Sequence, residues 1–225
     1  GKTPHIEYLI RLLSNYKIAT LSRGYKRTSK GFVLADVATN AAILGDEPFQ
    51  FYSKFPKVAV AVDADRRNGI AQLQEKINPD VILLDDAFQH RKVKAGFYIL
   101  LTTFNDLFVD DYILPFGNLR EPAFGKKRAN LIIVTKCPPD LSELAQENIR
   151  KRLKTNLPVY FSTIVYDDFV YNEKGKLEVN ALVNPKVILA GIANPSLFFK
   201  HLKKEQDTTL VFPDHHDFSE ADILK

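Results

Sequence analysis

The sequence contains one cysteine, Cys137, and neither methionine nor tryptophan. A single cysteine cannot form an internal disulfide or supply the several thiolates of a zinc cluster, so a reducing compartment is expected. No apolar run approaches the ~20 residues that an α-helix needs to span a bilayer, so the visible chain is not predicted to cross a membrane. The chain opens at Gly1 without a recognisable signal peptide, and whether a leader precedes it stays open.

The charge balance is mildly basic. The 225 residues include 31 Lys and Arg against 27 Asp and Glu, which gives a formal net charge of +4. This balance suits an anionic phosphate ligand or an anionic membrane surface, but it is too small to indicate nucleic-acid binding by itself.

Apolar runs alternate with amphipathic stretches along most of the chain. Several runs are nearly continuous in Val, Ile and Leu, as expected for parallel strands that are buried on both faces. The predicted strands are Lys17–Ser22, Val58–Asp63, Val81–Asp85, Phe97–Thr103, Leu131–Lys136 and Val187–Ala193. The predicted helices are Pro4–Leu13, Asn68–Lys76 and Leu141–Leu153. The alternation predicts an α/β fold built on a doubly wound, mostly parallel sheet.

The pattern changes after Pro158. Residues 159–179 form two extended runs around the turn signal Asn172–Gly175, which predicts a β-hairpin. We therefore expect three parts, namely a core over residues 1–158, a hairpin linker over 159–184 and a smaller second α/β lobe over 185–225.

The string Gly1-Lys2-Thr3 comes directly before a predicted helix. In a P-loop the backbone N–H groups hold phosphates, the Lys contacts the β- and γ-phosphate oxygens, and the Thr hydroxyl binds Mg²⁺. Only the last three residues of that motif are present, and such a short string often occurs by chance. Its position at the start of a helix in an α/β chain favours the P-loop interpretation.

Two acidic residues, Asp85 and Asp86, follow the buried run 81–84. Carboxylates at the carboxyl end of a parallel strand lie where ligands bind in such sheets. Mg²⁺ prefers oxygen ligands, so the pair resembles a Walker B site, with an acidic turn after a strand as the alternative. The two motifs support each other because phosphoryl transfer needs both a phosphate cradle and a metal site.

Three further loops carry charge. Asp46, in the string GDEP, could accept a proton from an attacking hydroxyl, although the simpler interpretation is a helix cap or turn. Arg23 and Arg120 lie in loops that could bind an anionic substrate through the planar guanidinium, with a solvated charged loop as the alternative.

The string Asp214-His215-His216-Asp217 follows the predicted strand Thr209–Phe212. Neighbouring side chains on an extended chain point in opposite directions, which disfavours a shared zinc site. One histidine tuned by a carboxylate for acid–base chemistry is the favoured interpretation, and an isolated surface histidine is the alternative.

Taken in order, the strings GKTP, SRGY, GDEP, DDAFQHR, GNLREP, GIANP and FPDHHDF resemble the tetraacyldisaccharide 4'-kinase family over essentially the whole chain. The resemblance implies a P-loop NTPase-type fold and a kinase that uses ATP and Mg²⁺. It would phosphorylate the 4'-hydroxyl of a tetraacyl glucosamine disaccharide 1-phosphate, giving lipid IVA in lipid A biosynthesis. It also implies peripheral contact with the cytoplasmic face of the bacterial inner membrane, a glycolipid partner and no nucleic acid.

The resemblance assigns roles position by position. The nucleotide phosphates would be bound by Gly1, Lys2 and Thr3. The metal would be held by Thr3, Asp85 and Asp86. The catalytic residues would be Lys2, Asp46 and His215, the last chosen over His216. The disaccharide site would be lined by Arg23, Gln89, His90, Asn118, Arg120 and Glu121. The residues near the adenine would be Thr135 and Lys136.

The chain departs from the family pattern in two ways. Ala87 stands where members commonly have Gly, a small change that leaves the adjacent acids in place. The Gly-rich start of the P-loop, the N-terminal membrane-facing helix and the usual C-terminus are not in the sequence, so we expect the chain to be part of a longer protein.

Two alternatives stay open. A GTPase or ATPase that drives a partner is one, because Thr135-Lys136 resembles a guanine-reading strand end, although no Asp follows at the needed spacing. A non-catalytic module that binds anionic lipid through basic loops is the other. The carboxylates Asp46, Asp85 and Asp86 disfavour the module, because clustered acids do not help to bind anions.

Overall fold

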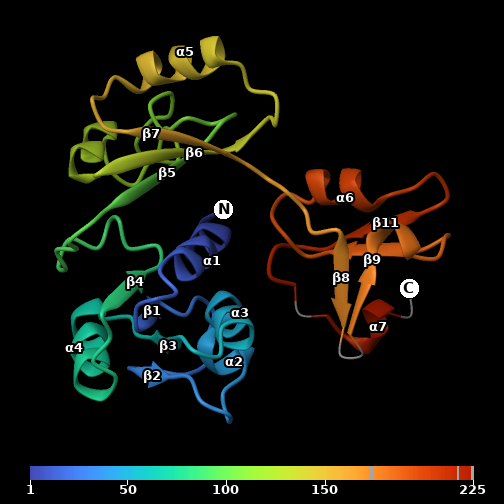
Figure 1. Cartoon of the computed structure of the whole chain (residues 1–225), viewed down its shortest axis with the longest axis horizontal. Helices are drawn as coiled ribbons and strands as arrows, with labels where there is room; N and C mark the ends of the chain where they lie inside the picture. Colours follow the sequence, from blue (N-terminus) through green and yellow to red (C-terminus); the bar gives the residue numbers. More distant parts are fainter. Residues whose placement is uncertain (173–174, 217, 224–225) are drawn as a thin grey trace. The chain divides into compact units, whose positions relative to one another are not determined.

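The computed structural model describes residues 1–172, 175–216 and 218–223. The chain divides into two compact units, residues 1–164 and residues 165–225 (Figure 1). Both units are α/β: strands in the larger unit are mostly parallel, and the smaller unit has one parallel pair and one antiparallel hairpin. An α/β fold with mostly parallel sheets, the coarser part of the prediction, is thereby confirmed.

The first sheet of the larger unit contains four strands in the order β2-β3-β1-β4. They are β1 (Ile18–Ser22), β2 (Val33–Leu34), β3 (Ala59–Val62) and β4 (Val81–Leu84). The central strand β1 pairs in parallel with both β3 and β4, and β2 is an antiparallel edge strand. All five residues of β1 are buried, as expected for a central parallel strand.

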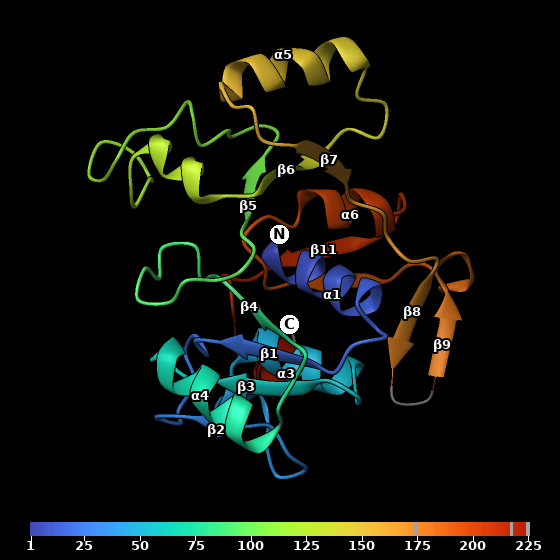
Figure 2. The ribbon, with the colours of Figure 1, turned by 60° about the vertical axis from the view of Figure 1, so that its left-hand side comes forward.

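Helices cover both faces of this sheet (Figure 2). They are α1 (Lys2–Leu12), α2 (Ala41–Leu44), α3 (Asp46–Lys54) and α4 (Arg66–Lys76). One cluster joins Ile6 and Ile10 of α1 and Phe51 of α3 to Ile18 of β1. A second cluster joins α4 to the alternate residues of β1 and β3, through Leu73, Ala19, Leu21 and Ala61. Because successive strand residues point to opposite faces, α1 and α3 lie on one side of the sheet and α4 on the other.

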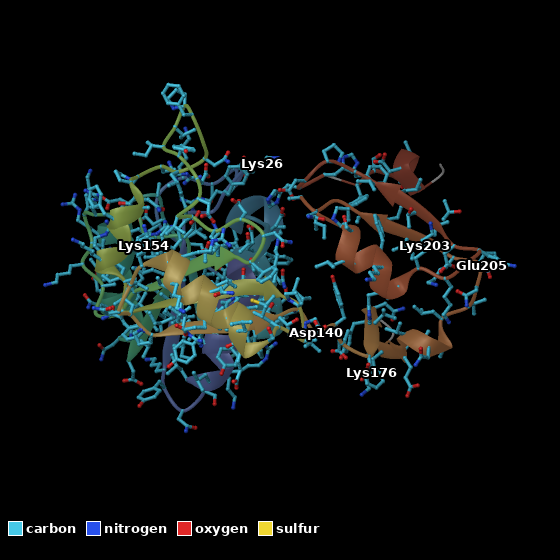
Figure 3. The ribbon with its side chains drawn as sticks, turned by 90° about the horizontal axis from the view of Figure 1, so that it is seen from above. Lys26, Asp140, Lys154, Lys176, Lys203 and Glu205 are labelled. Carbon is cyan, nitrogen blue, oxygen red and sulfur yellow. The ribbon has the colours of Figure 1, made fainter. Side chains whose placement is uncertain are left out.

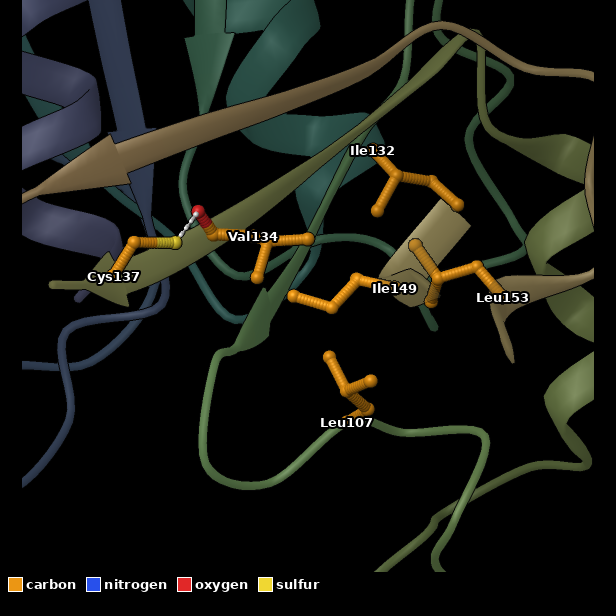
Figure 4. Close-up of a cluster of buried hydrophobic side chains, with 6 residues drawn as sticks. All are labelled: Leu107, Ile132, Val134, Cys137, Ile149 and Leu153. Atoms are coloured by element: carbon orange, nitrogen blue, oxygen red, sulfur yellow. Dashed lines mark hydrogen bonds between the residues drawn. The ribbon is translucent and has the colours of Figure 1, made fainter. Parts of the chain in front are cut away.

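A second sheet in the same unit contains three parallel strands. They are β5 (Ile99–Thr103), β6 (Leu131–Cys137) and β7 (Val159–Thr163). The 3₁₀ helix η1 (Ala123–Arg128) precedes β6, and α5 (Glu143–Leu153) follows it. The core of this part is made by Leu107, Ile132, Val134, Cys137, Ile149 and Leu153 (Figure 4). Cys137 Sγ lies 3.3 Å from the Val134 carbonyl oxygen, so the lone thiol is buried in this core.

Two details of the predicted fold are wrong. The larger unit contains two sheets where one doubly wound sheet was expected: β4 and β5, joined by turns and loops over residues 85–98, do not pair with each other. The run Val159–Thr163, assigned to the hairpin, is a parallel strand beside β6. Its side chains Val159 and Phe161 pack on the second core, a long-range contact that local sequence does not reveal.

The smaller unit contains the predicted hairpin, formed by β8 (Phe169–Asn172) and β9 (Gly175–Glu178). The turn residues 173–174 lie outside the described residues. The 3₁₀ helix η2 (Val179–Ala181) follows, then the parallel strands β10 (Val187–Ala190) and β11 (Thr208–Val211) with the helices α6 (Ser196–Leu202) and α7 (Glu220–Ile223). The boundary between the units follows Ile164, and the division into three domains stays a prediction.

A buried carboxylate joins β10 to the loop before β11. Asp207 is 6% exposed and accepts hydrogen bonds from the Lys186 ammonium and from the backbone N–H groups of Lys186 (2.9 Å) and Lys204 (2.7 Å). Burial raises the pKa of Asp207, but these hydrogen bonds outweigh it and lower the pKa to about 2. The ionised carboxylate therefore stabilises the smaller unit.

We expect Asp207→Asn to lower the melting temperature at pH 7 by several degrees. Because the folded pKa is depressed, the stabilisation is present above the ordinary carboxyl pKa and is lost as pH falls toward about 2. Thermal melts at pH 7 and pH 3 measure this, and the difference between wild type and variant should narrow at pH 3. Glu205→Gln, at an exposed site in the same loop (Figure 3), is the matched control. A difference that stays constant with pH would contradict this role.

Candidate active site

Three strand ends of the first sheet meet at one edge. The Asp63 N–H donates to the Ser22 carbonyl oxygen at 3.0 Å, and the Asp85 N–H donates to the Leu21 carbonyl oxygen at 3.1 Å. Asp63, Ser22 and Asp85 therefore lie side by side at the carboxyl ends of β3, β1 and β4. This is the edge at which open α/β sheets bind their ligands.

The two motifs predicted to act together are in contact here. The Lys2 ammonium, at the start of α1, lies 2.8 Å from a carboxylate oxygen of Asp86. Both side chains are about half exposed, at 54% and 48%, so a ligand can reach them from solvent. The pair is weak as an ion pair because water screens it, and Lys2 can therefore exchange its carboxylate partner for a phosphate at little cost.

Asp85 lies deeper than its neighbour. Burial raises its pKa; the charges of Asp86 and Glu47 raise it further, while Lys2 and Arg66 lower it. Its Oδ1 atom is buried and has no hydrogen-bond partner among the described residues. A buried carboxylate oxygen without a donor is costly unless a cation or water satisfies it, so the site favours a positively charged ligand.

Two more buried oxygens lie on the strand next to β4. The hydroxyls of Thr20 and Ser22, both on β1, are buried and have no hydrogen-bond partner in the described part of the chain. Mg²⁺ in phosphoryl-transfer sites usually takes one or two carboxylates, with water and phosphate oxygens completing its octahedron. The donors available from Thr3, Asp85 and Asp86 fit that chemistry. The described residues contain no group of three or more His, Cys, Asp or Glu side chains that could hold a metal alone.

Arg66 is a buried residue at this edge that the sequence motifs did not predict. It is 3% exposed, and its guanidinium donates to the backbone oxygens of Asp63 (2.6 Å) and Asp85 (3.1 Å). Burial lowers its pKa, Asp85 raises it, and the nearby charge of Arg23 lowers it. The guanidinium thus joins the ends of β3 and β4, and its Nε has no partner among the described residues.

A signal for Arg66 was present in the sequence. The string Asp63-Ala64-Asp65-Arg66 follows a buried strand and opens a helix, just as Asp85-Asp86 follows β4. The rule that placed a ligand site after β4 applies equally to β3. Burial of the arginine, which depends on strand order, could not be predicted.

The loops that contain Arg23 and Asp46 pack against each other. A Cβ on Gly45 would lie 3.0 Å from the Tyr25 carbonyl oxygen, and a Cβ on Gly24 would lie 2.9 Å from the Leu44 oxygen. Both glycines have positive φ, so the close approach and the backbone conformation each require glycine. Asp46 begins α3, where the partial positive charge of the helix terminus stabilises its carboxylate.

Charged residues of these two loops interact electrostatically with Asp85 and Arg66 at the strand ends. Glu47, next to Asp46, raises the pKa of Asp85, and Arg23 lowers the pKa of Arg66. The strings GKT, SRGY, GDEP and DDAFQHR, far apart in sequence, therefore converge at one edge of the first sheet.

The predicted sugar-site residue Glu121 is engaged in two ion pairs. It accepts from Arg128 at 2.6 and 2.9 Å and from Arg91 at 2.9 Å. The Arg128 hydrogen bonds lower its pKa most, with burial opposing and Arg91 adding to the effect. The guanidinium of Arg128 also lies over the Phe88 ring, 4.6 Å from its centroid. Glu121 therefore links its loop to the segment after Asp86, and direct substrate contact stays a prediction.

Four other residues predicted to line the sugar site lie on the same two segments: Gln89, His90, Asn118 and Arg120. His90 lines a hollow of about 540 Å³, and its Nε2 is buried without a partner among the described residues. Gln89 and Arg120 are exposed. The Asn118 N–H donates to the Asp111 carboxylate at 3.1 Å.

Thr135 and Lys136 lie at the end of β6. The Thr135 hydroxyl is buried and donates to the Thr102 carbonyl oxygen at 3.1 Å, so it stabilises the second sheet. Lys136 is exposed, and its charge is close enough to interact with Gly1. The end of β6 therefore lies near the start of α1, and a contact with adenine stays a prediction.

The two adjacent histidines have different surroundings. His216 Nε2 lies 3.1 Å from Asp222 Oδ2, and its ring stacks on Phe212 with 4.6 Å between centroids. His215 has positive φ, and its ring nitrogen lies 3.9 Å from Asp214 Oδ2. Asp217, the last residue of the string, lies outside the described residues. Asp46 belongs to the other unit, so its pairing with His215 stays a prediction.

Comparison with known proteins identifies the family. The sequence profile of the tetraacyldisaccharide-1-P 4'-kinases, LpxK, matches residues 1–225. The chain belongs to this family. The family predicted from the ordered motifs is thereby confirmed, as is the class of enzyme, an ATP-dependent kinase.

Similar proteins and a solved structure support the same family assignment. The chain is 61% identical to the tetraacyldisaccharide 4'-kinase of Flavobacterium psychrophilum over 99% of its own length and 67% of that protein. It is 47% identical to that of Bacteroides thetaiotaomicron, covering 63% of the relative. A crystal structure of LpxK from Aquifex aeolicus in complex with ATP superposes with a TM-score of 0.80 at 30% identity, over 98% of this chain and 69% of that one. The chain thus spans about two thirds of each of these family members.

None of the helices in the described part of the chain has both the length and the hydrophobicity required for a membrane span.

Proposed function

We propose that the chain transfers the γ-phosphate of ATP to the 4'-hydroxyl of tetraacyldisaccharide 1-phosphate, giving lipid IVA. Membership of the family makes the chain an ATP-dependent kinase of lipid A biosynthesis. The observation that carries the residue-level proposal is the contact of Lys2 with Asp86, beside the buried carboxylate of Asp85. A phosphate-binding cation and metal-binding acids are thus brought together where such sheets bind nucleotides.

The phosphate donor would be held at the start of α1. Gly1, Lys2 and Thr3 would bind the phosphates, with Lys2 exchanging its carboxylate partner for the γ-phosphate. Thr3, Asp85 and Asp86 would hold Mg²⁺, which when bound supplies positive charge beside the transferred group. The buried Arg66 would keep the two strand ends at a fixed spacing through its two backbone hydrogen bonds.

Asp46 would accept the proton of the attacking 4'-hydroxyl. It lies at the start of α3, in the loop that packs against the loop of Arg23. We propose His215, to which the family resemblance assigns this role, as the residue that orients Asp46. His216 suits that role less well, because its ring is held by Asp222 and Phe212.

The glycolipid would bind along the loops beside this centre. Its sugar and phosphate groups would contact Arg23, Gln89, His90, Asn118, Arg120 and Glu121. The enzyme would act as a peripheral protein at the cytoplasmic face of the inner membrane, where this lipid substrate is found.

The test is an assay of the full protein with labelled ATP and tetraacyldisaccharide 1-phosphate. We expect a bis-phosphorylated lipid, and no product when the acceptor is the 4'-deoxy analogue. GTP replaces ATP in a parallel reaction. Nucleotide hydrolysis without lipid phosphorylation would overturn the proposal in favour of an NTPase that drives a partner. Lipid binding without nucleotide turnover would overturn it in favour of a binding module.

A further inference from the structure

A short loop in the larger unit exposes large apolar side chains. Phe116 is 89% exposed, Tyr112 72%, Leu114 59% and Ile113 43%. We call residues 112–116 the apolar loop. Single exposed hydrophobic residues are normal on a protein surface, but four such side chains within five consecutive residues mark an interaction site.

The apolar loop is held by its own hydrogen bonds. The Asp111 carboxylate accepts from the Tyr112 N–H (2.7 Å) and the Asn118 N–H (3.1 Å). The Leu119 N–H donates to the Tyr112 oxygen and the Leu114 N–H to the Leu119 oxygen, each at 3.0 Å. A loop that satisfies these backbone groups internally can enter a less polar medium at lower cost than one that needs water for them.

A basic hollow lies next to the apolar loop. A recess of about 440 Å³ is lined by the loop together with Pro122 and Ala123. The next two residues, Phe124 and Gly125, line the hollow of about 540 Å³ described above. That hollow carries five basic side chains, namely His90, Arg91, Lys94, Lys127 and Arg128. Apolar and cationic surfaces therefore meet at residues 122–125.

Two of the basic side chains in this hollow are not used in ion pairs among the described residues. Glu121 pairs with Arg91 and Arg128. Lys94 and Lys127 are exposed, and neither forms an ion pair with another described residue. Lysines on long apolar stems beside an exposed aromatic tip suit the boundary between lipid headgroups and acyl chains.

We propose that the apolar loop inserts into the headgroup region of an anionic phospholipid bilayer, while Lys94 and Lys127 contact the lipid phosphates. The two lysines are complementary in charge to the phosphates of an anionic bilayer surface. An apolar groove on a protein could bind the loop but would leave these lysines without an anionic partner, so we favour the bilayer. The proposal rests on the proposed function only in that a lipid kinase must reach its substrate at a membrane. Asn118 and Arg120, predicted to bind the sugar, would then lie at the membrane surface.

A tryptophan reporter tests the contact directly. These 225 residues contain no tryptophan, so the emission that Phe116→Trp adds to the full protein is read as the difference from wild type. Leu144→Trp, at a 73% exposed site on α5, is the control. Vesicles contain phosphatidylglycerol and phosphatidylethanolamine with brominated acyl chains. We expect a blue shift and strong quenching at position 116 and neither at 144. Protein bound to the vesicles with no quenching at position 116 would overturn the proposal.

Vesicle partitioning measured without ATP keeps this result separate from kinase activity. Tyr112→Ser/Phe116→Ser should lower the partition coefficient by about ten-fold or more, against no change for the exposed control pair Leu144→Ser/Tyr160→Ser. Lys94→Gln/Lys127→Gln should lower it about five-fold per lysine on anionic vesicles, and much less on neutral ones. Normal partitioning of both the Tyr112→Ser/Phe116→Ser and the Lys94→Gln/Lys127→Gln variants would overturn the proposal, even if the protein proves to be an active kinase. Loss of kinase activity with intact loop insertion would count against the proposed function alone.

Discussion

Asp46→Ala is expected to lower phosphoryl transfer by about 10²- to 10⁴-fold while leaving ATP affinity nearly unchanged. The carboxylate begins α3 and lies next to Glu47, whose charge reaches the buried Asp85. In the proposed mechanism it takes the proton of the attacking hydroxyl, a role confined to the chemical step. Steady-state kinetics with the glycolipid and titration with a fluorescent ATP analogue separate turnover from nucleotide binding.

Two controls make this result specific. Asp140→Ala removes an exposed carboxylate from the turn between β6 and α5 (Figure 3) and should leave turnover unchanged. Asp46→Asn keeps the shape of the side chain and should be nearly as inactive as the alanine variant, because an amide cannot accept the proton. Near-normal turnover in either Asp46 variant would remove this residue from the mechanism.

Asp85→Asn is expected to lower activity by more than about 100-fold and at the same time to stabilise the fold. Activity falls because an amide is a poor ligand for the metal. Stability rises because burial already raises the pKa of Asp85, so the ionised carboxylate is disfavoured in the folded protein. Removal of about 1 kcal/mol of this cost would raise Tm by roughly 2–4 °C.

The pH dependence distinguishes this explanation from a general packing effect. The pKa of Asp85 is higher in the folded protein than in the unfolded chain, so the folded protein binds its proton more tightly. Asp85 therefore destabilises the fold increasingly as the pH rises from the unfolded-state pKa to the folded-state pKa. The Tm gain of Asp85→Asn should therefore be present at pH 7 and disappear below the ordinary carboxyl pKa. Thermal melts of wild type, Asp85→Asn and the surface control Asp140→Asn measure it. A variant less stable than wild type at pH 7 would contradict the assignment.

The two predictions share a physical basis. The edge of the first sheet concentrates carboxylates and arginines at buried strand ends, an arrangement that costs stability and favours charged ligands. In the described part of the chain, unsatisfied buried side-chain atoms are found in Thr20, Ser22, Arg66, Asp85 and His90. Thr20 and Ser22 belong to β1, and Asp85 and Arg66 follow the ends of β4 and β3. His90 lies on the segment after Asp86.

Sequence reasoning predicted where the candidate motifs lie in the fold because each is a contiguous string next to a recognisable strand or helix. A buried strand is recognisable from its Val, Ile and Leu content, and the residues after it lie at the ligand edge whatever the rest of the fold does. This placed Asp85 and Asp86 correctly after β4 and Lys2 and Thr3 at the start of α1. The same reasoning, applied to β3, would have found the string that contains Arg66.

What the sequence by itself determined is the main parallel strands, the helices α1, α4 and α5, the positions of the motifs and, through their order, the family. Only the tertiary structure decided which residues meet: that Lys2 contacts Asp86, that Arg66 is buried between two strand ends, that Glu121 is held by two arginines and that Val159–Thr163 joins a second sheet. Local patterns depend on a few neighbouring residues. Burial and ion pairing depend on strand order and on long-range packing, which no local pattern encodes.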